Sequence, residues 1–275
     1  MNRYWKLVNF ELYRFLKLYV ALIALTIILQ FTGVVVKSLS YVHQANSDIY
    51  EHGMSGAQFI EQNGLANFMQ IAGSLWFVAP IMISATVILG YIFLIWYRDW
   101  FAKNTFIYRL LMLPTSRLTI YFAKASAILL MVLGLIALEI IILPFQLSLF
   151  QLLVPAELRQ DIPITAVLGF QVLAIIIPGT FIQFVLHYLA GFMLVCVLFT
   201  AILFERCYRW KGLFVAVLYC AASVMVFIAP AILAGIGKID FYPDELVSLE
   251  IVLGLVVMGA AVWISQFLLK NKITV

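Results

Sequence analysis

The chain has 275 residues, of which 65% are apolar and 11% are charged, and its formal net charge is +4. Soluble domains carry about 25% charged residues, and no single soluble core could bury this much apolar surface, so lipid must solvate much of the chain. The composition therefore predicts an all-α membrane protein, because a lipid-exposed helix satisfies its own backbone hydrogen bonds. The small positive charge gives no reason to expect nucleic-acid binding, and the three cysteines form no CxxC pair that would indicate a metal site or a disulfide framework.

Residues 1–17 form the first predicted element, an amphipathic helix that lies along the membrane surface. At 100° per residue, cations occupy one arc of this helix and aromatic and aliphatic side chains fill the opposite side. The cations that we expect at the membrane surface are Arg3, Lys6, Arg14 and Lys17. A cationic stripe opposite an apolar face is typical of helices bound to an anionic leaflet. The alternative is a cytosolic extension of the first span.

Glu11 is the exception in this helix, because it lies on the apolar side. A carboxylate in such surroundings is costly unless it finds a partner. We expect it to pair with a cation from the segment between Arg98 and Lys124.

Six apolar stretches are long enough to cross a bilayer, which requires about 20 residues of helix. They are Leu18–Val36, Trp76–Tyr97, Leu118–Leu143, Phe181–Phe204, Leu213–Ile236 and Ser248–Leu269. The first stretch is longer than the apolar part of a typical signal peptide and no small-residue cleavage site follows it, so it is predicted to be a retained span. Residues 18–275 then form one six-span domain.

The distribution of cations predicts that both termini face the cytoplasm. With this orientation, all but three of the 17 Lys and Arg residues lie on the inner side of the membrane. The three outward-facing cations are Lys37, Arg159 and Lys238. An inward excess of Lys and Arg is the rule for membrane proteins, and a wrong number of spans would destroy it.

Two segments are predicted on the outer face. In residues 37–75, Ser55 and Gln58 have the spacing of a capping box, so this segment is expected to fold as short helices. Residues 164–177 are apolar but too short to span, and Pro178 follows closely. We expect an outer half-helix here; the alternative is that it joins the fourth span as one kinked helix.

The cytoplasmic segment 98–117 is unusually basic and aromatic for so apolar a chain. A short helix is expected to begin at Asp99, where an acid suits the helix dipole, and to end before Pro114. Its faces mix aromatic, aliphatic and basic side chains, which suits contact with a protein partner. An ordinary positive loop with interfacial aromatics is the other interpretation.

No motif for chemistry is found in the chain. A phosphate-binding GxxxxGK[ST] loop, an HExxH pair and a GxSxG elbow are all missing, so no catalytic residue and no metal site are predicted. Glu139 is the only acid well inside a span, and His187 lies at a similar predicted depth in the fourth span. They are a candidate intramembrane polar pair; the alternative is two unrelated interfacial groups.

The chain resembles the permease subunits of type-2 ABC transporters, in the exporter class. The likeness rests on NFELYRFLK in the N-terminal helix, on NTFIYRLLMLPTSRLTIYFAK after the second span, and on the final QFLLKNKITV. The residues of the middle stretch that match the family are Thr105, Leu111, Pro114, Ser116, Arg117 and Lys124. Asn104 stands where the family commonly has glycine.

The resemblance implies that the segment after the second span is a coupling helix, seated in a groove of a separate cytosolic ABC ATPase subunit. The residues expected to contact the ATPase are Trp100, Lys103, Phe106, Arg109 and Leu110. ATP and Mg would be held by that subunit, and this chain would carry no cofactor and would not be an enzyme.

It further implies pairing with a second permease copy or a sister permease in a bacterial plasma membrane. The charge of the predicted outer segments, nine acids against three cations, favours export of an amphipathic or peptide-like substrate such as a cationic antimicrobial peptide. The alternative function is a transporter or accessory membrane protein that uses no ATPase.

Overall fold

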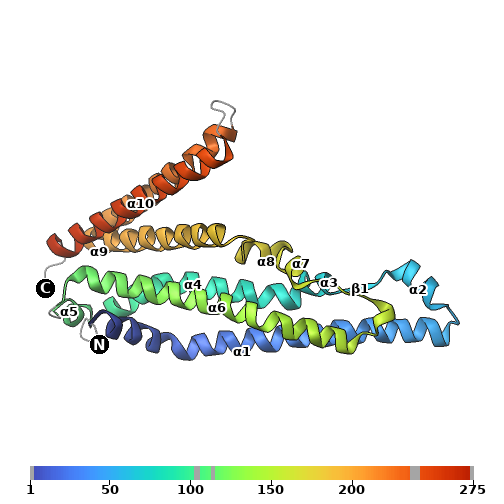
Figure 1. The fold of residues 1–275 in the computed structure, drawn as a ribbon. Helices are drawn as coiled ribbons and strands as arrows, with labels where there is room; N and C mark the ends of the chain where they lie inside the picture. The colour runs from blue at the N-terminus through green and yellow to red at the C-terminus, as the bar shows by residue number, and fades with distance from the viewer. Residues whose placement is uncertain (1–2, 102–105, 113–114, 236–241, 273–275) are drawn as a thin grey trace. The chain divides into compact units, whose positions relative to one another are not determined.

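In a computed structural model, the protein is described over residues 3–101, 106–112, 115–235 and 242–272, and it is almost entirely helical (Figure 1). The helices are α1 (Arg3–Asn46), η1 (Ser47–Glu51), α2 (Gly56–Asn63), α3 (Phe68–Ala72), α4 (Leu75–Phe101), α5 (Phe106–Leu111), α6 (Arg117–Leu153), η2 (Ala156–Leu158), α7 (Ile164–Leu168), α8 (Gln171–Ile176), α9 (Phe181–Gly235) and α10 (Pro243–Asn271). Strands β1 (Ala66–Asn67) and β2 (Arg159–Gln160) form a short parallel bridge.

Five of these helices are long and apolar enough to cross a membrane: α1 together with η1, α4, α6, α9 and α10. Helical content and the five candidate spans therefore confirm the prediction of a helical, multi-pass membrane protein. The helices assemble into two compact units. The first unit contains residues 1–14, 88–130 and 185–275, and the second unit contains residues 15–87 and 131–184, so α1, α4 and α6 each contribute to both.

In the first unit, α9 folds back on itself at Arg209. This residue has φ 53° and ψ −127°, which no right-handed helix accommodates. The rings of Phe204 and Tyr219 lie 5.7 Å apart, whereas a straight helix would separate these two residues by about 22 Å. The chain therefore reverses direction, and the predicted spans Phe181–Phe204 and Leu213–Ile236 lie on opposite sides of the reversal.

Gly212 allows this reversal to be tight. A Cβ atom at this position would collide with the backbone of Phe204, including its carbonyl oxygen. Only glycine, which has no side chain, permits so close an approach of two backbones.

Aromatic packing joins α4, α6 and α9 in the first unit. The ring of Phe199 lies 5.5 Å from Trp96 and 5.5 Å from Tyr121, in edge-to-face geometry with both. Next to these rings, the Thr200 hydroxyl bonds to the Ala261 carbonyl at 3.1 Å and to the Ser265 hydroxyl at 2.8 Å, which ties α9 to α10. Buried edge-to-face aromatic pairs add stabilisation beyond the area that they bury.

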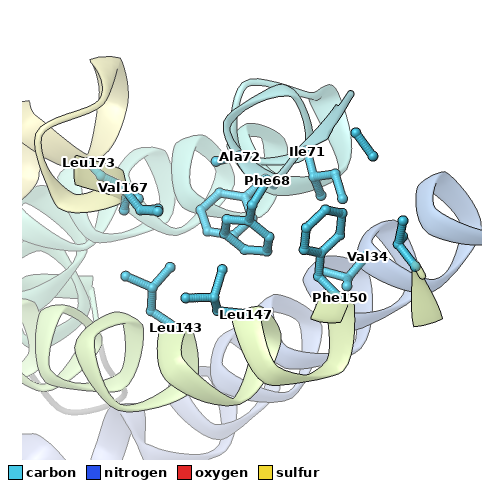
Figure 2. Packing of buried hydrophobic residues seen from close by; sticks show 12 residues of the cluster. Val34, Phe68, Ile71, Ala72, Leu143, Leu147, Phe150, Val167 and Leu173 are labelled. Atoms are coloured by element: carbon cyan, nitrogen blue, oxygen red, sulfur yellow. The ribbon is translucent and has the colours of Figure 1, made fainter. Parts of the chain in front are cut away.

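The core of the second unit is a cluster of twelve buried apolar residues around Phe68 and Phe150 (Figure 2). These two rings meet edge to face at 5.8 Å between centroids. Figure 2 also shows Val34 of α1 beside Phe150, and Val167 and Leu173 from the short helices α7 and α8. The segments predicted on the outer face thus pack on the ends of long helices.

Within residues 37–75 the predicted short helices are present as η1, α2 and α3, but residues 37–46 continue α1, which extends beyond the predicted end of the first span at Val36. Ser55 caps α2, because its hydroxyl accepts from the Gln58 amide at 3.3 Å while the Gln58 side chain accepts from the Ser55 amide at 3.0 Å. Residues 164–177 differ from the expected single half-helix, since α7 and α8 are separate and each spans little more than one turn. The segment is also not continuous with α9, which begins at Phe181.

The helix expected to begin at Asp99 does not begin there. Instead, α4 continues to Phe101 with Asp99 fully buried inside it, and α5 starts only at Phe106. The ion pairs of Asp99, described below, supply the physical reason. At the N-terminus, α1 runs without interruption from Arg3 to Asn46, so residues 3–17 are continuous with the first span.

Candidate functional site

Lys124 of α6 is the centre of a buried ion network in the first unit. Its side chain has no exposed surface, and its ammonium group uses all three of its donors. It bonds to Glu11 Oε1 at 2.6 Å, to Asp99 Oδ2 at 2.5 Å and to the carbonyl oxygen of Ile95 at 3.0 Å. A buried ammonium is tolerated in an apolar interior only when it is paired and hydrogen-bonded in this way.

Two arginines complete the network. Arg14 donates to Asp99 Oδ1 at 2.6 Å, and Arg98 donates to Glu11 Oε2 at 3.1 Å and to the Tyr91 hydroxyl at 3.2 Å. Asp99 therefore faces Lys124 and Arg14, and Glu11 faces Lys124, Arg98 and, at 3.8 Å, Arg14. The expectation that Glu11 pairs with a cation between Arg98 and Lys124 is confirmed, and it pairs with both of these residues.

Helical spacing explains how three segments meet in this network. Glu11 and Arg14 are three residues apart on α1, and Ile95 and Asp99 are four residues apart on α4, so each pair lies on one face of its helix. The network thus joins α1, α4 and α6 within the first unit. Removing one partner of a buried ion pair costs about 3–5 kcal/mol, because the other charge is left uncompensated.

Next to α5, the ends of several helices are held together by cations. The guanidinium of Arg206 lies 4.5 Å from the centre of the Tyr97 ring and 4.7 Å from that of Phe101, which joins α9 to α4. The Tyr97 hydroxyl bonds to Glu205 at 2.5 Å. At the start of α6, Arg117 donates to the Leu269 carbonyl of α10.

Exposed aromatic and basic side chains occur at the end of α4, in and just after α5, at the α9 reversal and at the end of α10, and we name this group of residues the basic aromatic surface. Its members are Phe101, Arg109, Met112, Tyr208, Arg209, Trp210, Lys211 and Lys272. Trp210 is 87% exposed, Phe101 73% and Met112 69%. Exposed aromatic, methionine and arginine side chains of this kind are typical of protein interaction surfaces.

The predicted coupling residues differ in exposure and in the helix to which they belong. Arg109 of α5 is exposed, whereas Leu110 is 5% exposed and packs inward. Trp100 is half-buried in the last turn of α4 rather than in the short helix. Phe106 is the first residue of α5, and Lys103 lies outside the described residues.

Sequence reasoning did not single out the turn at Arg209 as part of such a surface. The signal was present in RCYRWKG, residues 206–212, where cations alternate with aromatic residues on the side of the membrane that the cation distribution assigns to the cytoplasm. Its charges predict that the turn lies on the inner side, and the aromatic residues between them, Tyr208 and Trp210, are the further signal of an interaction surface.

The candidate pair of Glu139 and His187 stays a prediction. Glu139 is 6% exposed in the second unit, and both of its carboxylate oxygens accept from Gln30, at 2.9 Å and 3.2 Å. His187 belongs to the first unit, where its exposed ring contacts Tyr188.

Among the cations assigned to the membrane surface, Arg3, Lys6 and Lys17 are exposed. Arg14 is different, because its guanidinium group bonds to buried Asp99. A membrane-surface role therefore stays a prediction for these residues.

Fold and composition together define a helical, multi-pass membrane protein. Within the described part of the chain, no group of three or more His, Cys, Asp or Glu residues could hold a metal ion. Comparison of the chain with protein families, curated proteins and solved structures gives no match.

Proposed function

We propose that this chain is the membrane-spanning permease subunit of an ATP-driven exporter of the type-2 ABC class. The observation that carries the proposal is the basic aromatic surface, because a chain without a phosphate-binding loop needs a docking place for an external ATPase. Arg109 of α5 and Trp210 at the α9 reversal are its central members. The sequence resemblance points to the same kind of partner.

The proposed topology has six spans with both termini in the cytoplasm. The reversal at Arg209 supports it, since each arm of α9 contains one apolar stretch of spanning length. With this topology the basic aromatic surface faces the cytoplasm, in agreement with the inward excess of Lys and Arg.

In the proposed mechanism, closure of two ATPase subunits pushes on α5 and on the α9 reversal. The buried network of Lys124, Glu11 and Asp99 fastens α4 and α6 to α1. A push on the segment between α4 and α6 would therefore move these helices together rather than bend the segment alone. Packed and ion-paired elements transmit displacement because they are not freely deformable.

ATP and Mg would reside on the ATPase subunits of a bacterial plasma membrane complex. A second copy of the chain, or a sister permease, would complete the pathway. The proposed cargo is an amphipathic or peptide-like substrate, for which the acidic outer segments are suited: the described acids there include Asp48, Glu51, Glu61 and Glu157.

The proposal predicts that an ABC ATPase is encoded beside this chain, and the test is reconstitution with that ATPase. Arg109→Glu, Trp210→Ala and the double variant are purified with the ATPase and assayed for complex formation and ATP hydrolysis in proteoliposomes. We expect each single change to weaken the complex by about tenfold, or ~1.4 kcal/mol, as for a typical interface anchor. Lys37→Glu is the matched control, because Lys37 is exposed and predicted on the outer side.

Equal affinity of all variants for the ATPase would refute the docking surface. Undiminished transport by this chain without any ATPase would favour the alternative of an ATPase-independent transporter or accessory protein.

A further inference from the structure

The second unit contains a chain of three buried polar side chains inside its apolar helices. Gln146 of α6 donates to the Gln30 side-chain oxygen at 2.9 Å, and Gln30 of α1 donates to both Glu139 oxygens. The exposed fractions are 0% for Gln146, 1% for Gln30 and 6% for Glu139. Polar groups at such positions in a membrane are costly and mark functional sites more often than structural ones.

The contact between Gln30 and the Phe77 carbonyl fixes the orientation of the Gln30 amide. The Gln30 Nε2 atom lies 3.4 Å from that oxygen, which can only accept a hydrogen bond. The same Nε2 atom therefore faces Glu139 as a donor, and the Gln30 oxygen is left to accept from Gln146. Gln30 thus donates to the carboxylate and accepts from Gln146, and Glu139 acts only as an acceptor in these contacts.

Among the described residues, Glu139 has no cationic partner. Glu139 takes part in none of the ion pairs that the described residues form. In the first unit, by contrast, Asp99 faces two cations and Glu11 faces three. An amide donor from Gln30 is weak compensation for a buried negative charge.

Unpartnered polar atoms occur in the same helices. Over the described residues, Gln146 Oε1, Thr26 Oγ1 and Ser84 Oγ are buried without a hydrogen-bond partner. Thr26 lies one turn from Gln30 on the same face of α1, and Ser84 lies two turns from Phe77 on α4. Gln146 Oε1 can only accept, so the cluster needs both a positive charge and hydrogen-bond donors.

We propose that the Gln30–Glu139–Gln146 cluster is an intramembrane binding site for a single positively charged group that donates hydrogen bonds, of the ammonium type. Glu139 neutralises the charge, and the free acceptor of Gln146 supplements it. One carboxylate suits a monovalent group, whereas hard divalent ions are held by six or more oxygen ligands, usually with several carboxylates. The group we have in mind is a protonated amine on a solute. The site does not depend on the proposed ATPase.

The experiment reads the carboxylate directly by infrared difference spectroscopy of the purified chain in lipid. Methylammonium chloride is perfused over the protein at fixed pH and ionic strength, and tetramethylammonium chloride, which has the same charge but no N–H donor, is the comparison. We expect methylammonium to shift a carboxylate band, with a half-saturating concentration about tenfold lower than that of tetramethylammonium. The shift should vanish in Glu139→Gln and persist in Glu61→Gln, the same change at an exposed position.

A band shift that persists in Glu139→Gln would overturn the proposal, as would equal responses to the two cations or none in the wild type. The wild-type comparison of the two cations decides the question even if Glu139→Gln does not fold.

Discussion

Glu11 and Glu139 show how differently one side-chain type is accommodated in this protein. The two residues have similarly small exposed fractions, 3% and 6%. Glu11 faces Lys124 and Arg98, whereas Glu139 receives only the amide of Gln30. The first arrangement neutralises charge within the chain and suits a fixed junction; the second leaves a charge for a ligand to neutralise.

Lys124→Met tests whether the ion network stabilises the fold. The change keeps most of the side-chain volume and removes the ammonium between Glu11 and Asp99, so two buried carboxylates lose their shared partner. We expect the free energy of unfolding in mixed detergent micelles to fall by about 3–5 kcal/mol.

Lys270→Met is the matched control, because Lys270 is exposed in the last turn of α10. Its effect should stay within about 0.5 kcal/mol. Adding Asp99→Asn to Lys124→Met should recover none of the loss, since Asp99 still pairs with Arg14 when Lys124 is absent. Similar losses for the two lysine variants would contradict the assignment.

Among the helices, periodicity and hydrophobicity predicted the long apolar elements, and cap chemistry predicted α2 correctly. The end of α4 could not be predicted in this way, because Asp99 suits a helix start by its local chemistry. Its true position is set by contacts with Arg14 and Lys124, which are distant in the sequence. The pairing of Glu11 with a distant cation could be predicted, because a carboxylate on the apolar side of its helix requires a partner.

Close packing of α1 on α4 in the second unit depends on Gly33. A Cβ atom at this position would lie 2.5 Å from the Cβ of Trp76, whereas one at Gly90 in α4 would meet nothing within 4 Å. Alanine is favoured over glycine within a helix by about 0.5–1 kcal/mol. We therefore expect Gly90→Ala to raise the free energy of unfolding by that amount.

Gly33→Ala should lower it by about 1–3 kcal/mol, because overpacking outweighs the helical gain. Thermal or detergent unfolding of both variants under the same conditions checks the pair. Changes of the same sign would mean that α1 and α4 are not in close contact at Gly33.

For the molecule as a whole, composition predicted the membrane class, but the number of crossings rests on the turn at Arg209. Nothing in the residue pattern gave the conformation of that turn, which depends on backbone contact between Gly212 and Phe204. Of the residues predicted to contact an ATPase, Arg109 is exposed and Leu110 is buried, and the contact itself stays a prediction. Contacts between distant helices decided the difference, and sequence periodicity does not encode them.

Cysteine labelling in intact cells tests the proposed topology. Cys196, Cys207 and Cys220 are free and are first replaced by alanine. Tyr50→Cys and Tyr242→Cys, introduced singly at positions that are 81% and 75% exposed, should react with an impermeant maleimide from outside.

Trp210→Cys should react only after the cells are permeabilised, because the α9 reversal is proposed to face the cytoplasm. Labelling of Trp210→Cys from outside, at the rate of Tyr50→Cys, would invert the proposed orientation and remove the docking surface from the ATPase.

Burial of the Lys124 amine should also control its reactivity toward acylating reagents. An amine with no exposed surface and all three donors occupied cannot meet an acylating reagent unless α1, α4 and α6 separate. Exposed amines such as that of Lys270 need no such separation. In a time course of acetylation read by mass spectrometry, Lys124 should therefore be modified last, at a rate set by opening of the junction. The acetylation rate of Lys124 would then measure how often a conformational change separates these helices.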